Sequence, residues 1–241
     1  MRLTDMNCLR SLVVAVCLAM ALPFASLPLR APLFAQKAAP PGTGDTFKDT
    51  SMFKPPAGAR VAVVEFEDLE CPACSHAFPI VHQAVAHYNI PLVRRDFPLQ
   101  QHFWSFDGAV WARYLQDKVS PKMAEEYRGA VFAAQTGIAS KDDMLAFTRK
   151  FFQSHGLQMP FVPDPTGLFA TEVKADRAVG ERMGLQHTPT IVVCSQREWV
   201  QVTDVSMLYQ TIEQVEAQAG PITPAKSPVK KPTVPSKKVA N

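Results

Sequence analysis

Residues 61–81 read VAVVEFEDLECPACSHAFPIV and decide the fold. The run over 59–67 is apolar and rich in β-branched side chains, which is typical of a buried central strand. A helix is expected over about 72–88, because a proline opens it without losing a backbone donor and apolar residues then recur at the helical spacing. Two cysteines, Cys71 and Cys74, lie where the strand passes into this helix.

The segments on either side predict an α/β fold built from two halves. A second strand at about 90–98 makes a strand–helix–strand order, which favours a parallel βαβ unit. Two further strands, at 188–194 and 198–202, are followed by a helix over about 205–219 and form a ββα half.

The chain between these halves, about 103–187, predicts a helical insertion. Asp164 and Pro165 are expected to begin its last helix, as cap and first residue. Phe103 and its aromatic neighbours are expected to pack the insertion against the sheet. The helices are expected near 104–118, 121–135, 140–155 and 165–183, and the aromatic residues are Phe103, Trp104 and Trp111.

Both ends of the chain are expected to lie outside the folded domain of residues 59–220. Residues 1–35 combine early arginines with the apolar stretch SLVVAVCLAMAL and are typical of an export signal, with an uncleaved membrane anchor as the alternative. Residues 36–58 are rich in Pro, Gly and Thr and predict a flexible linker. Residues 221–241 hold five lysines and no acid and predict a disordered tail. The folded part is therefore expected outside the cytoplasm, in the periplasm.

Charge argues against nucleic acid as a partner. The formal net charge is +3, but the lysine tail and the signal carry more positive charge than that. The expected folded domain is therefore mildly acidic and offers no basic face.

Export changes the meaning of the cysteines. Cys8 and Cys17 fall in the signal, which leaves Cys71, Cys74 and Cys194 in a compartment where disulfides persist. Three cysteines make one reactive pair and one bystander. Cys194 is expected to be a buried inert thiol, because a strand carries it far from the pair.

The spacing of Cys71 and Cys74 favours redox chemistry. With Cys71 at the helix N-cap, the N–H groups of Ala73 and Cys74 are expected to point at its sulfur, and the helix dipole adds positive charge there. Both effects favour the thiolate, which is the nucleophile. Cys74, one turn on, is placed to resolve a mixed disulfide on Cys71.

A structural disulfide and half of a zinc site are the alternatives for this pair. A disulfide across so short a loop adds little stability. Zinc needs a second pair of ligands, and the sequence has no other C-x-x-C and no H-x-x-x-H. No metal is therefore expected.

Two more positions are expected to belong to the same site. Glu65 lies in the apolar run, six residues before Cys71, so burial should raise its pKa unless a cation such as Arg60 or Arg94 holds it. Such an acid is able to exchange a proton with the resolving cysteine. Pro189 opens a strand directly after Thr188, which predicts a cis peptide bond.

These motifs resemble the DsbA-like branch of the thioredoxin superfamily. The similarity rests on EFEDLECPAC at 65–74, RRDFPL at 94–99, the helical insertion and the TPT loop at 188–190, and it covers about 55–218. It implies a thioredoxin fold, a central mixed sheet interrupted by a helical subdomain.

The resemblance also implies roles for individual residues. Cys71 would be the nucleophile, Cys74 the resolving thiol and Glu65 a proton relay. Thr188 and Pro189 would pack against the disulfide and bind the substrate backbone.

Pro72 and Ala73, between the cysteines, are expected to contact substrate as well. The best-known oxidants of the family have histidine where Ala73 stands. Its absence predicts a less oxidising centre and leaves the direction of electron flow open.

The sequence thus predicts an exported thiol:disulfide oxidoreductase that forms disulfides in secreted proteins. It would be a monomer without a cofactor, because the dithiol itself carries the electrons. Its partners would be unfolded or reduced secreted proteins and a membrane redox protein that recycles the pair. The alternatives are an extracytoplasmic reductase or isomerase, and a chaperone-like binding protein whose disulfide is only structural.

Overall fold

The computed structural model describes residues 46–220. The expected signal segment, the first part of the linker at 36–45 and the tail at 221–241 lie outside these residues. Within the described range, no helix is long and apolar enough to cross a membrane.

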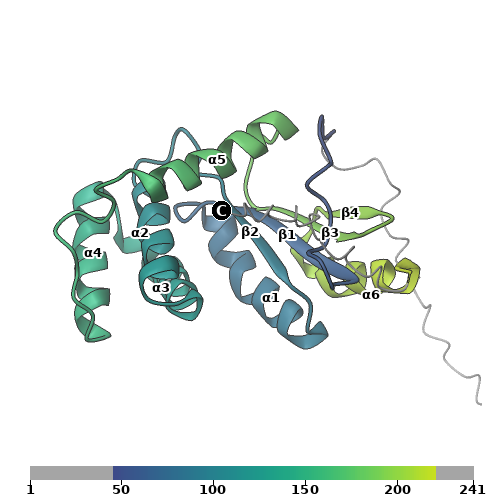
Figure 1. The fold of residues 1–241 in the computed structure, drawn as a ribbon, viewed down its shortest axis with the longest axis horizontal. Coiled ribbons are helices and arrows are strands. Elements are labelled where there is room, and N and C mark those ends of the chain that lie inside the picture. Colours follow the sequence, from purple (N-terminus) through teal and green to yellow (C-terminus); the bar gives the residue numbers. More distant parts are fainter. Residues whose placement is uncertain (1–45, 221–241) are drawn as a thin grey trace, which may run out of the picture. The chain divides into compact units, whose positions relative to one another are not determined.

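The sheet at the centre of the fold has four strands in the order β2-β1-β3-β4 (Figure 1). They are β1 (Val61–Glu67), β2 (Leu92–Asp96), β3 (Thr190–Ser195) and β4 (Trp199–Val202). β1 runs parallel to β2 and antiparallel to β3, and β4 is antiparallel to β3. The predicted βαβ and ββα halves are therefore confirmed, with β1 central as its buried apolar run requires.

Helices cover both faces of the sheet (Figure 1). α1 (Pro72–Tyr88) and α6 (Leu208–Gln218), the latter preceded by a short 3₁₀ turn, pack on one face. The opposite face is covered by the end of α5 (Leu168–Met183) and by the segment before β1. Side chains alternate along β1 between the two faces, so every second residue faces α1.

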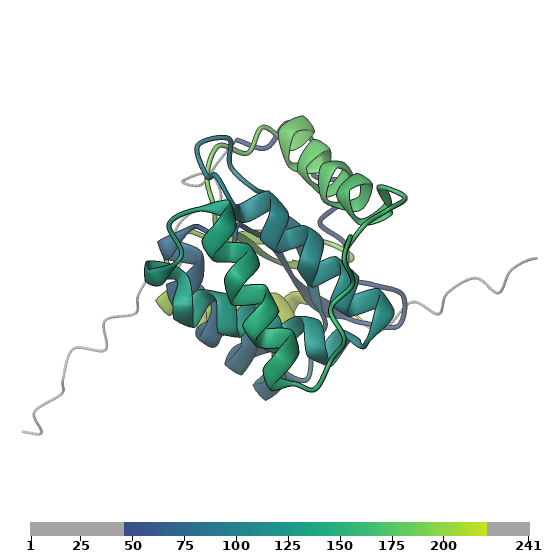
Figure 2. The ribbon, with the colours of Figure 1, turned by 90° about the vertical axis from the view of Figure 1, so that its left-hand side faces the viewer.

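The insertion between β2 and β3 contains α5 and the three helices before it: α2 (Ser105–Lys118), α3 (Pro121–Ala134) and α4 (Lys141–Ser154). Figure 2 shows them stacked side by side. Ser120 and Ser140 cap α3 and α4 by accepting from backbone amides three residues on, which fixes where each helix begins. Their apolar core is continuous with the cysteine pair. One buried cluster contains Cys71, Cys74, Trp104, Trp111 and the aromatic residues of α3 and α4.

The predicted start of α5 at Pro165 is wrong, because the helix begins at Leu168. Gly167 takes the N-cap position with a left-handed backbone, φ 72°. The Asp164 carboxylate still accepts from the amide of Ala170 at 2.8 Å. Asp164 therefore caps the helix from three residues further upstream, and Pro165 lies in the intervening turn.

The prediction for Phe103 is also wrong. Trp104 and Trp111 are buried, but the Phe103 side chain is 72% exposed. Trp104 fills the core and its indole N–H donates to the Ile138 carbonyl at 3.0 Å. The adjacent Phe103 instead points to solvent.

The linker prediction fails over residues 46–58. The Phe53 side chain is 1% exposed and packs with Phe47 and Trp199, with ring centroids 5.0–5.4 Å apart. The amide of Lys48 donates to the Met183 carbonyl at 2.9 Å. Burial of these aromatic rings holds the segment on the sheet despite its prolines.

Candidate active site

The site lies in the loop that joins β1 to α1. Cys71 occupies the N-cap of α1 with an extended backbone, and Pro72 is the first residue of the helix, as predicted. Both cysteines are free thiols; Cys74 is fully buried and Cys71 nearly so. Pro72 and Ala73 are exposed between them.

The environment of Cys71 favours its thiolate. Its pKa falls from the ordinary thiol value to about 5, chiefly because the neighbouring Cys74 thiol donates a hydrogen bond to it. The Thr188 side chain and the amides of Cys74 and Ala73 lower it further, against the opposing effect of burial. The two amides stabilise the thiolate electrostatically, although the Cys71 sulfur accepts no capping hydrogen bond.

Cys74 has the opposite character. Burial raises its pKa well above the usual thiol value, and the hydrogen bond to Cys71 raises it further. The sulfur accepts from the amide of Asp68 at 3.4 Å. At neutral pH the pair therefore holds one thiolate at Cys71 and one proton on Cys74, the arrangement of a nucleophile and a resolving thiol.

The predicted cis peptide bond joins Thr188 to Pro189. The Thr188 carbonyl lies within 3.2 Å of the Cys71 sulfur, across 117 residues of sequence. The Thr188 hydroxyl oxygen has no hydrogen-bond partner among the described residues, so it can donate to the sulfur once Cys71 is ionised. The tertiary fold thus unites these two predicted residues with the cysteines.

Glu65 is buried in β1, 1% exposed. The alternation of β1 turns it toward α1, the helix that carries Cys74 on its buried side. Burial, reinforced by the charge of Glu67, raises its pKa to about 8. Arg94 approaches only to 3.9 Å, and neither carboxyl oxygen has a hydrogen-bond partner among residues 46–220. Glu65 is therefore protonated at neutral pH.

A buried network of ion pairs surrounds Glu65 and ties β1 and β2 to the insertion. Arg128 of α3 contacts Glu67 at 2.6 Å and Asp96 at 2.8 Å, and Arg94 contacts Glu67 at 3.1 Å. Its other members are Arg95, Arg113, Glu125 and Asp176. Each arginine neutralises carboxylates that would otherwise be costly to bury.

The insertion also holds the active-site loop directly, through residues that sequence reasoning missed. The Gln135 side-chain amide donates to the carbonyls of Leu69 at 2.8 Å and Cys71 at 3.1 Å. The Glu70 carboxylate accepts from the amides that begin α2, at 2.8 and 3.2 Å. Asp68, 1% exposed, accepts from side chains of the same region. The run of acidic residues before Cys71 could have predicted these contacts, because acidic side chains buried at the end of a strand need hydrogen-bond partners.

Cys194 is placed as predicted, as a buried thiol in β3 opposite Ala62. Burial raises its pKa to about 11, so it stays protonated and unreactive at neutral pH. His187, two residues before the cis-proline, is exposed in the loop. Over residues 46–220 no group of three or more His, Cys, Asp or Glu side chains is placed to hold a metal ion.

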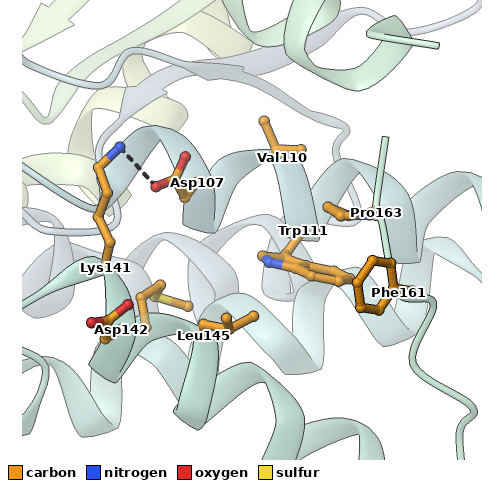
Figure 3. A pocket seen from close by; sticks show the side chains of 9 residues that line it. Asp107, Val110, Trp111, Lys141, Asp142, Leu145, Phe161 and Pro163 are labelled. Carbon is orange, nitrogen blue, oxygen red and sulfur yellow. Dashed lines mark ion pairs between the residues drawn. The ribbon is translucent and has the colours of Figure 1, made fainter. Parts of the chain in front are cut away.

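A hollow of about 320 Å³ lies in the insertion between α2 and α4 (Figure 3). Trp111 and Phe161 line it, and an ion pair of 3.0 Å between Lys141 and Asp107 stands at its edge. No residue predicted for the active site lines it. Trp111 nevertheless belongs to the same buried cluster as the two cysteines.

Comparison with known proteins agrees with this geometry. A family model described as Thioredoxin matches residues 49–204, whereas no curated protein matches the chain in sequence. Because the matched residues make up more than half of the chain, the chain belongs to this thioredoxin family.

Solved structures share the fold at low sequence identity. ScsC from Proteus mirabilis is 15% identical with a TM-score of 0.53, over 67% of this chain and 70% of that one. The thiol-disulfide exchange protein α-DsbA2 from Wolbachia pipientis is 17% identical with a TM-score of 0.52, over 66% and 83%. A periplasmic thioredoxin-like protein from Salmonella enterica serovar Typhimurium is 15% identical with a TM-score of 0.53, over 67% and 87%. The sheet with its helical insertion is thus a fold that this chain shares with ScsC and α-DsbA2.

Proposed function

We propose that the chain forms disulfide bonds in exported proteins by exchange at Cys71 and Cys74. The observation that carries this proposal is the opposed chemistry of the two thiols, since the pKa of Cys71 falls to about 5 while that of Cys74 is raised. A stabilised thiolate favours the reduced form of the pair, which makes its disulfide a better oxidant. Ala73 contributes no cation, so the hydrogen bonds to Cys71 supply this stabilisation.

The exchange proceeds in two steps. A substrate thiolate attacks the Cys71 sulfur of the Cys71–Cys74 disulfide, that bond breaks, and Cys74 leaves as a thiolate. A second substrate thiolate then attacks the substrate sulfur of the mixed disulfide and releases Cys71 as a thiolate. The substrate loses two electrons, the pair gains them, and no cofactor is needed.

The surrounding residues assist these steps. Glu65, protonated at neutral pH and turned toward α1, donates its proton to the departing Cys74 thiolate. Pro72 and Ala73 contact the substrate beside the attacked sulfur, where they are exposed. Thr188 and Pro189, next to Cys71, hold the substrate backbone.

The substrates are unfolded or reduced exported proteins, and a membrane redox protein reoxidises the pair. The periplasmic thioredoxin-like relative and the signal-like first residues support a periplasmic location. In this proposal the protein acts as a monomer, and one chain supplies every residue of the site.

The test is oxidative refolding of a reduced secreted protein with catalytic amounts of the oxidised chain. The wild-type chain is expected to accelerate disulfide formation, and C71S and C71S/C74S are expected to lose this activity. Cys194→Ser is the matched control, because it removes a buried thiol outside the site, and it should retain full activity. Undiminished refolding with C71S/C74S would exclude exchange at this pair and point to a chaperone-like binding protein.

Equilibration with glutathione then decides the direction of electron flow. A pair that is reduced at moderately oxidising ratios of glutathione supports oxidation of substrates. A pair that remains oxidised until glutathione is strongly reducing would instead assign the chain as a reductase.

A further inference from the structure

A line of hydrogen bonds runs from His102 to the resolving cysteine. The amide of Asp68 donates to the Cys74 sulfur at 3.4 Å. The carboxylate of the same residue accepts from His102 Nδ1 at 2.7 Å. A carboxylate only accepts, so Nδ1 carries the proton in this bond.

Asp68 is held from several directions. Its Oδ2 accepts from the amide of Leu99 at 2.7 Å as well as from His102. Its Oδ1 accepts from the amide of Glu70 at 2.7 Å and from the Ser105 hydroxyl. The His102 side chain is 18% exposed, whereas that of Asp68 is fully buried. His102 therefore reaches from the protein surface to a buried carboxylate beside Cys74.

We propose that His102 is a positioning residue for thiol–disulfide exchange: it fixes Asp68 so that the Asp68 amide points at the Cys74 sulfur. The inference rests on the proposed exchange at Cys71 and Cys74. It holds for either direction of electron flow, because Cys74 passes through the thiolate both when it attacks and when it leaves.

The chemistry shows why this amide matters. In the resolving step the Cys74 thiolate attacks the Cys71 sulfur of a mixed disulfide, the new Cys71–Cys74 bond forms, and the partner sulfur leaves with the electron pair of the broken bond. Cys74 is fully buried, so its negative charge is costly without a donor. The Asp68 amide supplies a donor to that sulfur, and a charge-assisted hydrogen bond is stronger than a neutral one.

Loss of the His102 donor loosens Asp68 without releasing it. The carboxylate keeps its bonds from Leu99, Glu70 and Ser105 but loses the one from the imidazole, so the Asp68 amide is aimed less firmly at the Cys74 sulfur. This slows the step that passes through the Cys74 thiolate and leaves attack at Cys71 unchanged.

The experiment follows a single adduct. The reduced full-length chain is mixed with glutathione disulfide and quenched in acid at intervals, and mass spectrometry follows the glutathione adduct on Cys71. Its formation reports the Cys71 thiolate, and its decay reports attack by Cys74. His102→Ala is expected to slow the decay about tenfold, the effect of one hydrogen bond to a charged group, with adduct formation unchanged.

Two amide variants separate positioning from stability. His102→Asn places a donor where Nδ1 lies and should restore decay to within about twofold of wild type. His102→Gln places its donor where Nε2 lies and should remain as slow as alanine. Comparison of the asparagine and glutamine variants tests the positioning role of His102 even if the alanine variant does not fold. His155→Ala is the matched control and should behave as wild type, because His155 Nδ1 makes a 2.8 Å bond to the Phe151 carbonyl, away from the loop.

Wild-type decay in His102→Ala, or equal decay in the asparagine and glutamine variants, would overturn the inference. Failure of the wild-type chain to form the adduct at all would instead overturn the proposed exchange, so the two failures are distinguishable.

Discussion

The hydrogen bond from Cys74 makes the largest contribution to the low pKa of Cys71. Cys74→Ala removes this donor and leaves the helix N-terminus and the Thr188 side chain in place. A hydrogen bond to a charged group is worth about 1.5–3 kcal/mol. One pKa unit corresponds to about 1.4 kcal/mol. The pKa of Cys71 is therefore expected to rise from about 5 by roughly one to two units.

Cys74→Ser is the matched comparison for this variant. Its hydroxyl keeps a donor at nearly the same place, so the pKa of Cys71 should rise by less than about one unit. The ultraviolet absorbance of the thiolate, followed through a pH titration, measures both shifts. Cys194 does not interfere, because its pKa is raised to about 11.

A pKa that stays near 5 in Cys74→Ala would refute this reasoning. It would mean that the helix N-terminus and Thr188 stabilise the thiolate without Cys74. A serine variant as strongly shifted as the alanine variant would contradict the claim that the donor, rather than the sulfur, is responsible.

Three further predictions concern stability, each measured by urea unfolding of the reduced chain. Folding lowers the pKa of Cys71. Its contribution to the free energy of unfolding is therefore absent below about pH 5 and grows until the pH reaches the ordinary thiol pKa of about 8.5. C71S should lose this pH-dependent gain in stability. The pKa of Glu65 is raised on folding, so its contribution to the free energy of unfolding is lost as the pH rises from the ordinary carboxyl pKa to about 8. E65Q should accordingly be more stable than wild type at pH 7, on the order of 3 kcal/mol, and equal to it near pH 4. Arg128→Met leaves the buried carboxylates of Glu67 and Asp96 without their shared cation and should cost about 3–5 kcal/mol.

Each of these predictions has a clear contrary result. Lys122→Ala is the control for Arg128→Met, since Lys122 forms an exposed pair with Glu126 on the same helix and should change stability by under about 0.5 kcal/mol. A similar loss in both variants would show that burial of the Arg128 network is unimportant. A stability difference between E65Q and wild type that does not vary with pH would mean that Glu65 does not titrate on folding. A C71S variant with the same pH profile as wild type would mean that the Cys71 thiolate adds nothing to stability.

The local elements and the reactive pair were readable from the sequence because their signals are local. A proline after Cys71 and an apolar period of 3.6 residues define α1, and both features lie within a few turns of chain. The apolar run of β1 marked a buried strand because a strand covered on both faces carries apolar side chains at successive positions. Pro189 was recognisable because proline has no N–H to give to a strand ladder, so a proline at the start of a strand marks a turn in the backbone.

Other features failed or stayed hidden because they depend on what packs nearby. Phe103 and Trp104 are equally apolar to a sequence pattern, yet Trp104 is buried and Phe103 is exposed. Phe53 lies in a proline-rich stretch, and contacts with residues distant in sequence, among them Trp199, bury it. No local pattern distinguishes these cases.

By itself the sequence determined the order of strands and helices and the position of Cys71 at a helix N-terminus, and it pointed to the pair for which exchange is proposed, since spacing and backbone chemistry act within a short segment. Only the tertiary structure decided the chemistry around the pair. It set Thr188 against the Cys71 sulfur, buried Glu65 beside an arginine too distant to hold it, and joined His102 through Asp68 to Cys74. Each of these contacts joins residues from different elements, and their strength depends on distance and burial, which exist only once the chain has folded.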